Sequence, residues 1–232
     1  MISRIHLAGV WSGVAFLGCY LIGLWLLAGF VPAHQPMTDA TAIAAIYRAN
    51  ANGIRLGMIF VMIAAGFYLP WTVTLSALIR RMEGESSFLS QTQLIGGLAA
   101  SMFFVLPALI WQVAAFRPER NAELIQMLND AGWILTVTPD PPFYVQFIPL
   151  MVAIFLNRQQ PAPFPRWMGY ITLWACLLYS PAMVAYFFKS GPFAWNGLFP
   201  FWIPLSTFVC WELALYGLAY KYINQVHQQG NV

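Results

Sequence analysis

Charged residues are scarce in this chain, and their scarcity indicates its class. Of 232 residues, 8% are charged and 60% are hydrophobic, whereas soluble domains carry roughly 25% charged residues because their surface faces water. A soluble globule of this size would have too few polar side chains to cover its surface. The composition therefore predicts an integral membrane protein.

The basic residues, cysteines and histidines of this chain are not spaced as several functions would require. The 11 lysines and arginines form no basic run, so no nucleic-acid partner is expected. Cys19, Cys176 and Cys210 lie in apolar segments without the clustered spacing of a disulfide or zinc framework. The three histidines lie at segment ends or in loops, which argues against haem held between membrane helices. No metal site and no cofactor is expected.

Signature patterns of common membrane enzymes and transporters are also absent. The sequence has no His-Glu-x-x-His, Gly-x-Ser-x-Gly or phosphate-loop glycine pattern, which argues against the commonest membrane hydrolases and nucleotide-binding proteins. No apolar segment carries two acidic residues of a proton relay, so an ion-coupled pump is disfavoured. Proline positions differ between the two halves of the chain, which argues against an inverted-repeat transporter.

Long apolar segments are what the sequence does contain. Each exceeds the ~20 residues that a helix needs to cross a bilayer, so the chain is predicted to be all-α, a bundle of six transmembrane helices forming one domain over residues 1–232. The first segment has no cleavage site after it and is predicted to be an uncleaved helix. The segments are 7–31, 53–79, 92–116, 133–157, 167–188 and 199–222.

Lysines and arginines predict the orientation. With the N-terminus in the cytoplasm, the inner side holds six of them and the outer side five. The inner loops are short and concentrate their charge as Arg80-Arg81 and as Arg158 with Arg166, the setting in which the positive-inside rule performs best. Both termini are therefore predicted to be cytoplasmic.

Two outer loops and one span have irregular features. Residues 38–52 and 118–130 have apolar residues at helical spacing, so each is predicted to form a short external helix at the membrane interface. Thr138-Pro139-Asp140-Pro141-Pro142 interrupts the fourth span, because three prolines in four residues cannot continue a helix. Residues 133–137 are expected to form a re-entrant or interfacial piece, with Asp140 capping a membrane helix that begins at Pro141 and ends near Asn157.

Prolines and small residues predict how the helices pack. Prolines inside the later spans predict kinked helices and a partly open bundle. Gly9 with Gly13, and Gly96 and Gly97 with the small residues four positions later, favour close contacts inside the protein over dimerisation. The prolines concerned are Pro70, Pro107, Pro149, Pro181 and Pro204.

Glu212 is the only acidic residue well inside a predicted span. Aspartate, lysine or arginine at that depth costs about 2.5–3.5 kcal/mol on insertion scales, so an ionisable residue there is a candidate for function. The alternative is a structural glutamate that is protonated or hydrogen-bonded in the bundle core to Gln112, Gln146, a threonine or a tyrosine.

The other polar candidates lie near the predicted outer interface. If the later outer loops and the broken span come together, these residues form one polar, aromatic-rimmed mouth. The alternative is an ordinary belt of interfacial tryptophans and snorkelling arginines. The residues are Arg117, Arg120, Asp130, Trp133, Asp140, Lys189, Trp195 and Asn196.

One loop and its flanks carry a family resemblance. The loop is Phe187-Phe188-Lys189-Ser190-Gly191-Pro192-Phe193-Ala194-Trp195-Asn196-Gly197, with Phe164-Pro165-Arg166-Trp167 before it and Phe201-Trp202-Ile203-Pro204 after it. With these stretches, most of the chain resembles a family of uncharacterised six-span bacterial inner-membrane proteins. The resemblance implies a bacterial inner membrane and a six-span topology; it implies no activity and no catalytic residue.

Three functions are compatible with these features. The first is a non-enzymatic protein that binds a membrane lipid, another hydrophobic molecule or a membrane protein partner through the outer mouth. The second is an enzyme acting on an isoprenoid or other lipid, with Glu212 or Asp140 as general acid and aromatic walls that stabilise positive charge. The third is a small-solute transporter or channel component that uses Asp140 at the broken span.

Overall fold

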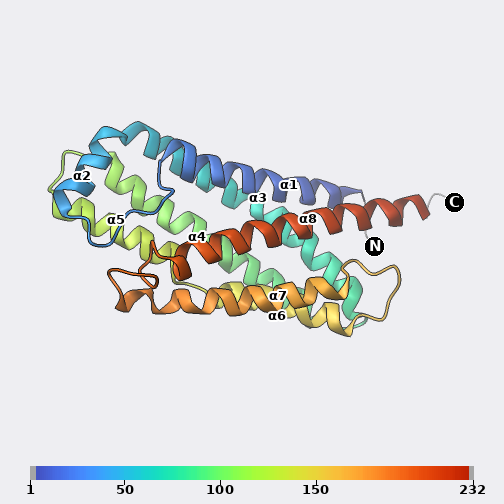
Figure 1. Cartoon of the computed structure of the whole chain (residues 1–232). Helices are drawn as coiled ribbons and strands as arrows, with labels where there is room; N and C mark the ends of the chain where they lie inside the picture. The colour runs from blue at the N-terminus through green and yellow to red at the C-terminus, as the bar shows by residue number, and fades with distance from the viewer. Residues whose placement is uncertain (1–3, 230–232) are drawn as a thin grey trace.

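The computed structural model describes residues 4–229, which are largely α-helical and contain no strand. Within these residues, six helical segments are long and apolar enough to cross a membrane, which confirms the prediction of six spans. They run along a common long axis as one bundle, and both chain ends lie at the same end of it (Figure 1). The chain is a multi-pass transmembrane protein.

Five of the spans are single helices or helices with one distorted end. The first is α1 (Ile5–Leu21) continued by the π-helix η1 (Ile22–Leu27), the second is α3 (Ala51–Glu83) and the third is α4 (Phe88–Phe116). The fifth is α7 (Arg166–Tyr179) continued by the 3-10 helix η2 (Ser180–Phe187). The sixth is the π-helix η3 (Leu198–Trp202) followed by α8 (Ile203–Gln229).

The fourth span consists of two helices. α5 (Ala122–Val137) and α6 (Pro141–Leu156) form one candidate span of 35 residues, interrupted at residues 138–140 as predicted. Residues 122–130 are helical, but the helix continues through 133–137, so the predicted external helix and re-entrant piece are one element. The N–H of Glu123 donates to the Asn121 side chain at the start of α5, and Gly132 lets the helix approach Trp111 of α4 closely.

α2 (Ala40–Ala49) is a short helix outside the six spans, within the predicted range 38–52. Asp39 caps it, because its carboxylate accepts a hydrogen bond from the N–H of Ala42 at 2.9 Å. α2 packs against α5 at the end of the bundle opposite the two termini (Figure 1). We call this the α2/α5 end, and the opposite end the terminal end.

Departures from α-helical geometry gather in the half of the bundle next to the α2/α5 end. η1, η2, η3 and the break at 138–140 all lie there, whereas the spans are regular α-helices in the terminal half. Pro70, Pro107 and Pro149 remain inside their helices. The predicted irregularity is therefore concentrated in one half of the molecule.

Small residues bring helices of the core close together. A Cβ atom on Gly9 would lie 1.9 Å from the hydroxyl oxygen of Thr74, and one on Gly97 would lie 1.9 Å from that of Thr72. The close internal contacts predicted from the small residues are confirmed. Large aromatic side chains fill the remaining space, including the fully buried Trp71, Trp111, Trp133 and Trp211.

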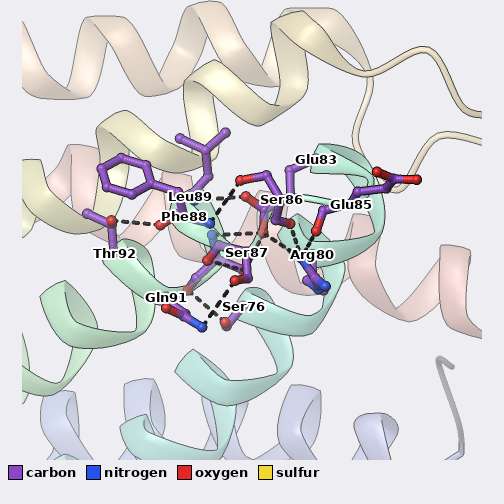
Figure 2. A network of polar contacts seen from close by, with 11 residues as sticks. Ser76, Arg80, Glu83, Glu85, Ser86, Ser87, Phe88, Leu89, Gln91 and Thr92 are labelled. Carbon is purple, nitrogen blue, oxygen red and sulfur yellow. Dashed lines mark hydrogen bonds and ion pairs between the residues drawn. The ribbon is translucent and has the colours of Figure 1, made fainter.

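A polar network closes the turn between α3 and α4 at the terminal end (Figure 2). The Glu83 carboxylate accepts hydrogen bonds from the N–H groups of Leu89 at 2.8 Å and Ser90 at 3.3 Å. Arg80 lies 3.9 Å from the same carboxylate and donates to the carbonyl oxygen of Glu85 at 3.1 Å. Arg80 and Glu83 are therefore engaged in holding this turn.

Candidate functional site

A cavity of about 80 Å³ lies in the α2/α5 half of the bundle. Five of the six spans contribute to its lining, and it adjoins both the break in the fourth span and η3. Among the described residues that line it, Asp140 is the only one with a carboxylate. Six aromatic residues share the lining: Tyr20, Phe104, Phe143, Tyr179, Phe201 and Phe208.

Asp140 occupies the N-cap position of α6, but its side chain does not cap the helix. An N-cap carboxylate normally accepts from the N–H of the second or third helical residue. Here the first two helical residues are prolines, which have no N–H, and the N–H of Phe143 binds the backbone carbonyl oxygen of Asp140 at 2.9 Å. Asp140 is therefore at the predicted cap position, but its side chain makes no capping hydrogen bond, and the carboxylate is left for another partner.

The Asp140 side chain is deeply buried, and one of its two carboxylate oxygens has no hydrogen-bond partner in the described chain. Asp140 is 4% exposed, and the oxygen without a partner is Oδ2. Burial of a carboxylate with an unpaired oxygen is costly, and the positive end of the α6 dipole offsets only part of that cost. The remaining free-energy cost of burial can be offset by a proton on the carboxyl group or by a cationic partner in the cavity.

The aromatic rings around Asp140 are in contact with one another. The Phe143 ring centroid lies 6.0 Å from that of Tyr179, 6.2 Å from that of Phe208 and 6.4 Å from that of Phe104. Ring faces carry negative electrostatic potential and attract cations. A carboxylate among such rings suits a ligand group that has an apolar surface and carries a positive charge.

Glu212 has different surroundings, outside this cavity and within the regular part of α8. It is fully buried; its Oε2 accepts a hydrogen bond from the indole N–H of Trp71 at 2.9 Å, and its Oε1 has no partner in the described part of the chain. Gln112 and Gln146 have other partners: Gln112 donates to the carbonyl oxygen of Arg55 at 2.8 Å, and Gln146 accepts from the Tyr68 hydroxyl at 2.7 Å. This placement favours the structural interpretation of Glu212.

The two tryptophans predicted for the rim of the mouth are packed inside the protein. Trp133 is fully buried, with its ring centroids 5.0 Å from Trp111 and 5.7 Å from Phe30. Trp195 is buried, and its indole N–H donates to the backbone carbonyl oxygen of His34 at 2.7 Å. They therefore form neither an open rim nor an interfacial belt.

The remaining predicted mouth residues lie at or near the surface of the α2/α5 end, outside the Asp140 cavity. Arg117 and Lys189 are exposed, whereas Arg120, Asp130 and Asn196 are partly buried. Asp130 accepts a hydrogen bond from the Asn129 side chain at 3.1 Å. Among the predicted mouth residues, Asp140 alone lines this cavity.

His34 belongs to a polar cluster that the sequence did not reveal. Its Nδ1 lies 2.8 Å from Oδ1 of Asn129, to which the Tyr47 hydroxyl also donates at 3.4 Å. Burial lowers the pKa of His34 below 6.5, and its bond to Asn129 opposes that shift. Burial, with a smaller effect of the Asp130 charge, raises the pKa of Tyr47 well above 10.0. Nothing in the local sequence of the His34 loop indicates that it folds onto α5.

The aromatic lining of the Asp140 cavity was also missed from the sequence. Tyr20, Phe104, Tyr179 and Phe208 come from four different spans. Each lies in an apolar segment, where an aromatic side chain is an ordinary core residue. Only the proline-rich break around Asp140 pointed to this region.

Comparison with known proteins adds no functional assignment. No protein-family model, no curated protein and no solved structure matches this chain. Within residues 4–229, no group of three or more histidine, cysteine, aspartate and glutamate side chains is placed to hold a metal ion. The cavity at Asp140 is the candidate site from which a function can be argued.

Proposed function

We propose that this protein binds a small cationic group of a hydrophobic or amphiphilic molecule in the cavity at Asp140. The observation that carries the proposal is the buried Oδ2 of Asp140, which has no partner within the described chain and belongs to the lining of an aromatic cavity. A protonated or quaternary amine supplies the missing charge. The surrounding rings stabilise the same charge through cation–π contacts.

The cavity volume limits the part of the ligand that it holds. About 80 Å³ is roughly half the ~150 Å³ of a cavity that accommodates benzene. It therefore takes a headgroup of a few heavy atoms rather than a complete lipid. The rest of an amphiphile would lie outside the cavity, along the lipid-facing side of the bundle.

The setting that we propose is the inner membrane of a bacterium, with both termini in the cytoplasm. The sequence resemblance supports the bacterial origin, and the arginines in the two short loops at the terminal end support the orientation. Gln159→Cys and Ser190→Cys, each made in a variant without the three native cysteines, test it with an impermeant maleimide. Labelling of position 190 from outside intact cells is expected, and labelling of position 159 instead would reverse the orientation.

A lipid-active enzyme with Asp140 as general acid is the second candidate function. The same aromatic walls favour it, because they would stabilise a developing carbocation. The cavity volume counts against an isoprenoid-sized substrate, and Glu212 lies outside the cavity. Turnover of a lipid substrate that Asp140→Asn abolished and Glu212→Gln left intact would favour the enzyme over simple binding.

Choline and its uncharged isostere 3,3-dimethylbutan-1-ol are the probes that test the binding proposal. They have nearly the same shape and differ in charge, so the contribution of Asp140 appears as the difference between them. We expect choline, but not the alcohol, to raise the melting temperature of the full-length protein in neutral detergent. Asp140→Asn should weaken choline binding about tenfold or more, because a carboxylate and a quaternary ammonium about 4 Å apart attract each other by about 4 kcal/mol at an effective dielectric constant of about 20, and about 1.4 kcal/mol corresponds to a tenfold change.

Glu85→Gln is the control for the loss of one negative charge. Glu85 is exposed in the turn between α3 and α4, at the other end of the bundle from Asp140. This variant should bind choline as the wild type does. Equal binding of the two probes, or equal choline binding by the wild type and Asp140→Asn, would overturn the proposal.

A further inference from the structure

A second and much larger cavity, of about 840 Å³, lies at the terminal end of the bundle. It is bounded by the last turn of α6, residues 157–165, the first turn of α7 and the last turns of α8 (Figure 1). Among the described residues, no side chain lines both this cavity and the one at Asp140. Its occupant is therefore independent of the proposed function.

The lining of this terminal cavity is cationic. Arg158, Arg166 and Lys221 line it, and no acidic residue is found among its described lining residues. Within residues 4–229 none of these three side chains forms a hydrogen bond or an ion pair, and the nearby acid Glu83 is already bonded to Arg80. Three like charges without a counter-ion repel one another. The cavity is therefore suited to an anion.

A buried hydroxyl group indicates what kind of anion fits. Tyr222 lines the cavity, is 2% exposed, and has a hydroxyl that donates to no acceptor in the described chain, although the Arg81 guanidinium is placed to donate to it. The guanidinium of Arg81 lies 5.9 Å from the centroid of the Tyr222 ring and adds positive charge behind it. Buried polar groups are nearly always hydrogen-bonded, so the Tyr222 hydroxyl calls for an acceptor oxygen in the cavity.

The same cavity has an apolar side. Ile154, Leu156 and Leu218 contribute to its lining, and exposed Trp167 and Tyr170 follow at the start of α7. Exposed tryptophan and tyrosine favour the headgroup level of a bilayer, where the ends of these spans would lie. A ligand in the cavity thus meets positive charge and hydrocarbon together, a combination that matches a phospholipid better than a free phosphate ion.

We infer that the terminal cavity binds the phosphate group of an anionic phospholipid. Arg158, Arg166 and Lys221 supply the positive charges, and the guanidinium groups can bind phosphate oxygens in a bidentate manner. The Tyr222 hydroxyl donates a further hydrogen bond. Basic pockets between membrane helices are suited to anionic headgroups, and about 840 Å³ lies in the ~300–1,000 Å³ range of ligand pockets.

Native mass spectrometry of the full-length protein with equimolar phosphatidylglycerol and phosphatidylcholine in neutral detergent tests this inference. We expect preferential retention of phosphatidylglycerol. Arg158→Gln, Arg166→Gln and Lys221→Gln should each weaken its binding about fivefold, the contribution of one basic residue near an anionic lipid surface. Tyr222→Phe, which removes only the hydroxyl, should weaken it a few-fold, roughly the loss of one hydrogen bond.

Arg4→Gln is the matched control, because it removes one positive charge at the same end from a residue outside the cavity lining. It should keep the wild-type affinity for phosphatidylglycerol. All variants should nearly keep the lipid-free melting temperature, because the three basic cavity side chains are exposed and Tyr222→Phe keeps the buried ring. Equal retention of the two lipids would overturn the assignment of this site. A loss of phosphatidylglycerol binding in Arg4→Gln as large as in the cavity variants would overturn it as well.

Glycerol 3-phosphate distinguishes the two possible sources of the phosphate group. It carries the phosphate without the acyl chains, so at equal concentration it should not displace phosphatidylglycerol. Displacement at equal concentration would overturn the assignment to a lipid. Failure of any of these tests leaves the choline experiment at Asp140 unaffected, because the two cavities have separate linings.

Discussion

Two carboxylates that lie inside this bundle differ in whether they adjoin a helix break and a cavity. Glu212 lies in the regular part of α8 and lines neither the Asp140 cavity nor the terminal cavity; its Oε2 accepts a hydrogen bond from Trp71, and its Oε1 has no partner in the described chain. Asp140 lies at the break between α5 and α6, lines a cavity, and has an Oδ2 without a partner in the described chain. A buried acid in a regular helix contributes to packing here, whereas a buried acid at a helix break is available to a ligand.

The difference between the two acids follows from the backbone around them. In α8 the backbone groups bond within the helix, so only the glutamate side chain requires partners, and Trp71 provides one for Oε2. At residues 138–140 the following prolines remove the N–H groups that would otherwise bind the Asp140 carboxylate. η1 and η3 lie in the same half of the bundle, and π-helical turns are frequent at functional sites. Inside the membrane, the α2/α5 half is therefore the half suited to binding.

Trp71→Phe should have the largest effect on this comparison. It leaves Oε2 of Glu212 without its hydrogen bond and removes part of a fully buried ring, so we expect a loss of about 2–4 kcal/mol in the free energy of unfolding. Titration with sodium dodecyl sulfate in mixed micelles measures this. Trp174→Phe, at a residue 61% exposed, should change it by less than about 0.5 kcal/mol. A Trp71→Phe protein as stable as the wild type would remove the distinction between the two acids.

Substitution of the acids themselves should change stability in opposite directions. Glu212→Leu leaves the indole N–H of Trp71 unpaired and should cost about 1–3 kcal/mol. Asp140→Asn removes a buried carboxylate with one unpaired oxygen and should raise the free energy of unfolding by about 1 kcal/mol. The same titration measures both changes. Similar losses in the two variants would mean that Asp140 is as much a packing residue as Glu212.

The spans and the break at Asp140 could be predicted because they depend on local chemistry. An apolar run of sufficient length and a cluster of prolines have the same consequence wherever the rest of the chain lies. Span ends were less predictable: the first ends at Leu27 instead of residue 31, because Gly29 adopts a positive φ of 70° that ends the helical path.

The partners of the candidate residues could not be predicted, because they lie far away in the sequence. Trp71 and Glu212 are 141 residues apart, and His34 and Asn129 are 95 apart. Tryptophan is a residue type common at membrane interfaces, yet Trp133 is buried, because α5 continues past it and packs closely against Trp111. Such contacts follow from how the helices pack, which hydropathy and turn signals do not encode.

The smallest effect is expected from pH, through His34, a partly buried ionisable residue that lies outside the spans. His34 resembles Glu212 in having a hydrogen-bond partner, and burial lowers its pKa below the ordinary 6.5. Between the folded and ordinary pKa values the unfolded chain binds a proton that the folded chain does not, so stability falls as the pH drops through 6.5 toward the folded pKa. We expect a melting temperature at pH 5.5 that is lower than at pH 7.5 by no more than about 4 °C.

His34→Gln separates this titration from that of other groups. A glutamine amide can still donate to Oδ1 of Asn129 but carries no titratable proton in this range, so the variant should lose part of the dependence between pH 5.5 and 7.5. The comparison is of the melting-temperature difference in each protein, which cancels any uniform loss of stability. If both proteins lose stability equally on acidification, His34 is already as solvated as in the unfolded chain, and the α2/α5 end is more open to water than its buried contacts indicate.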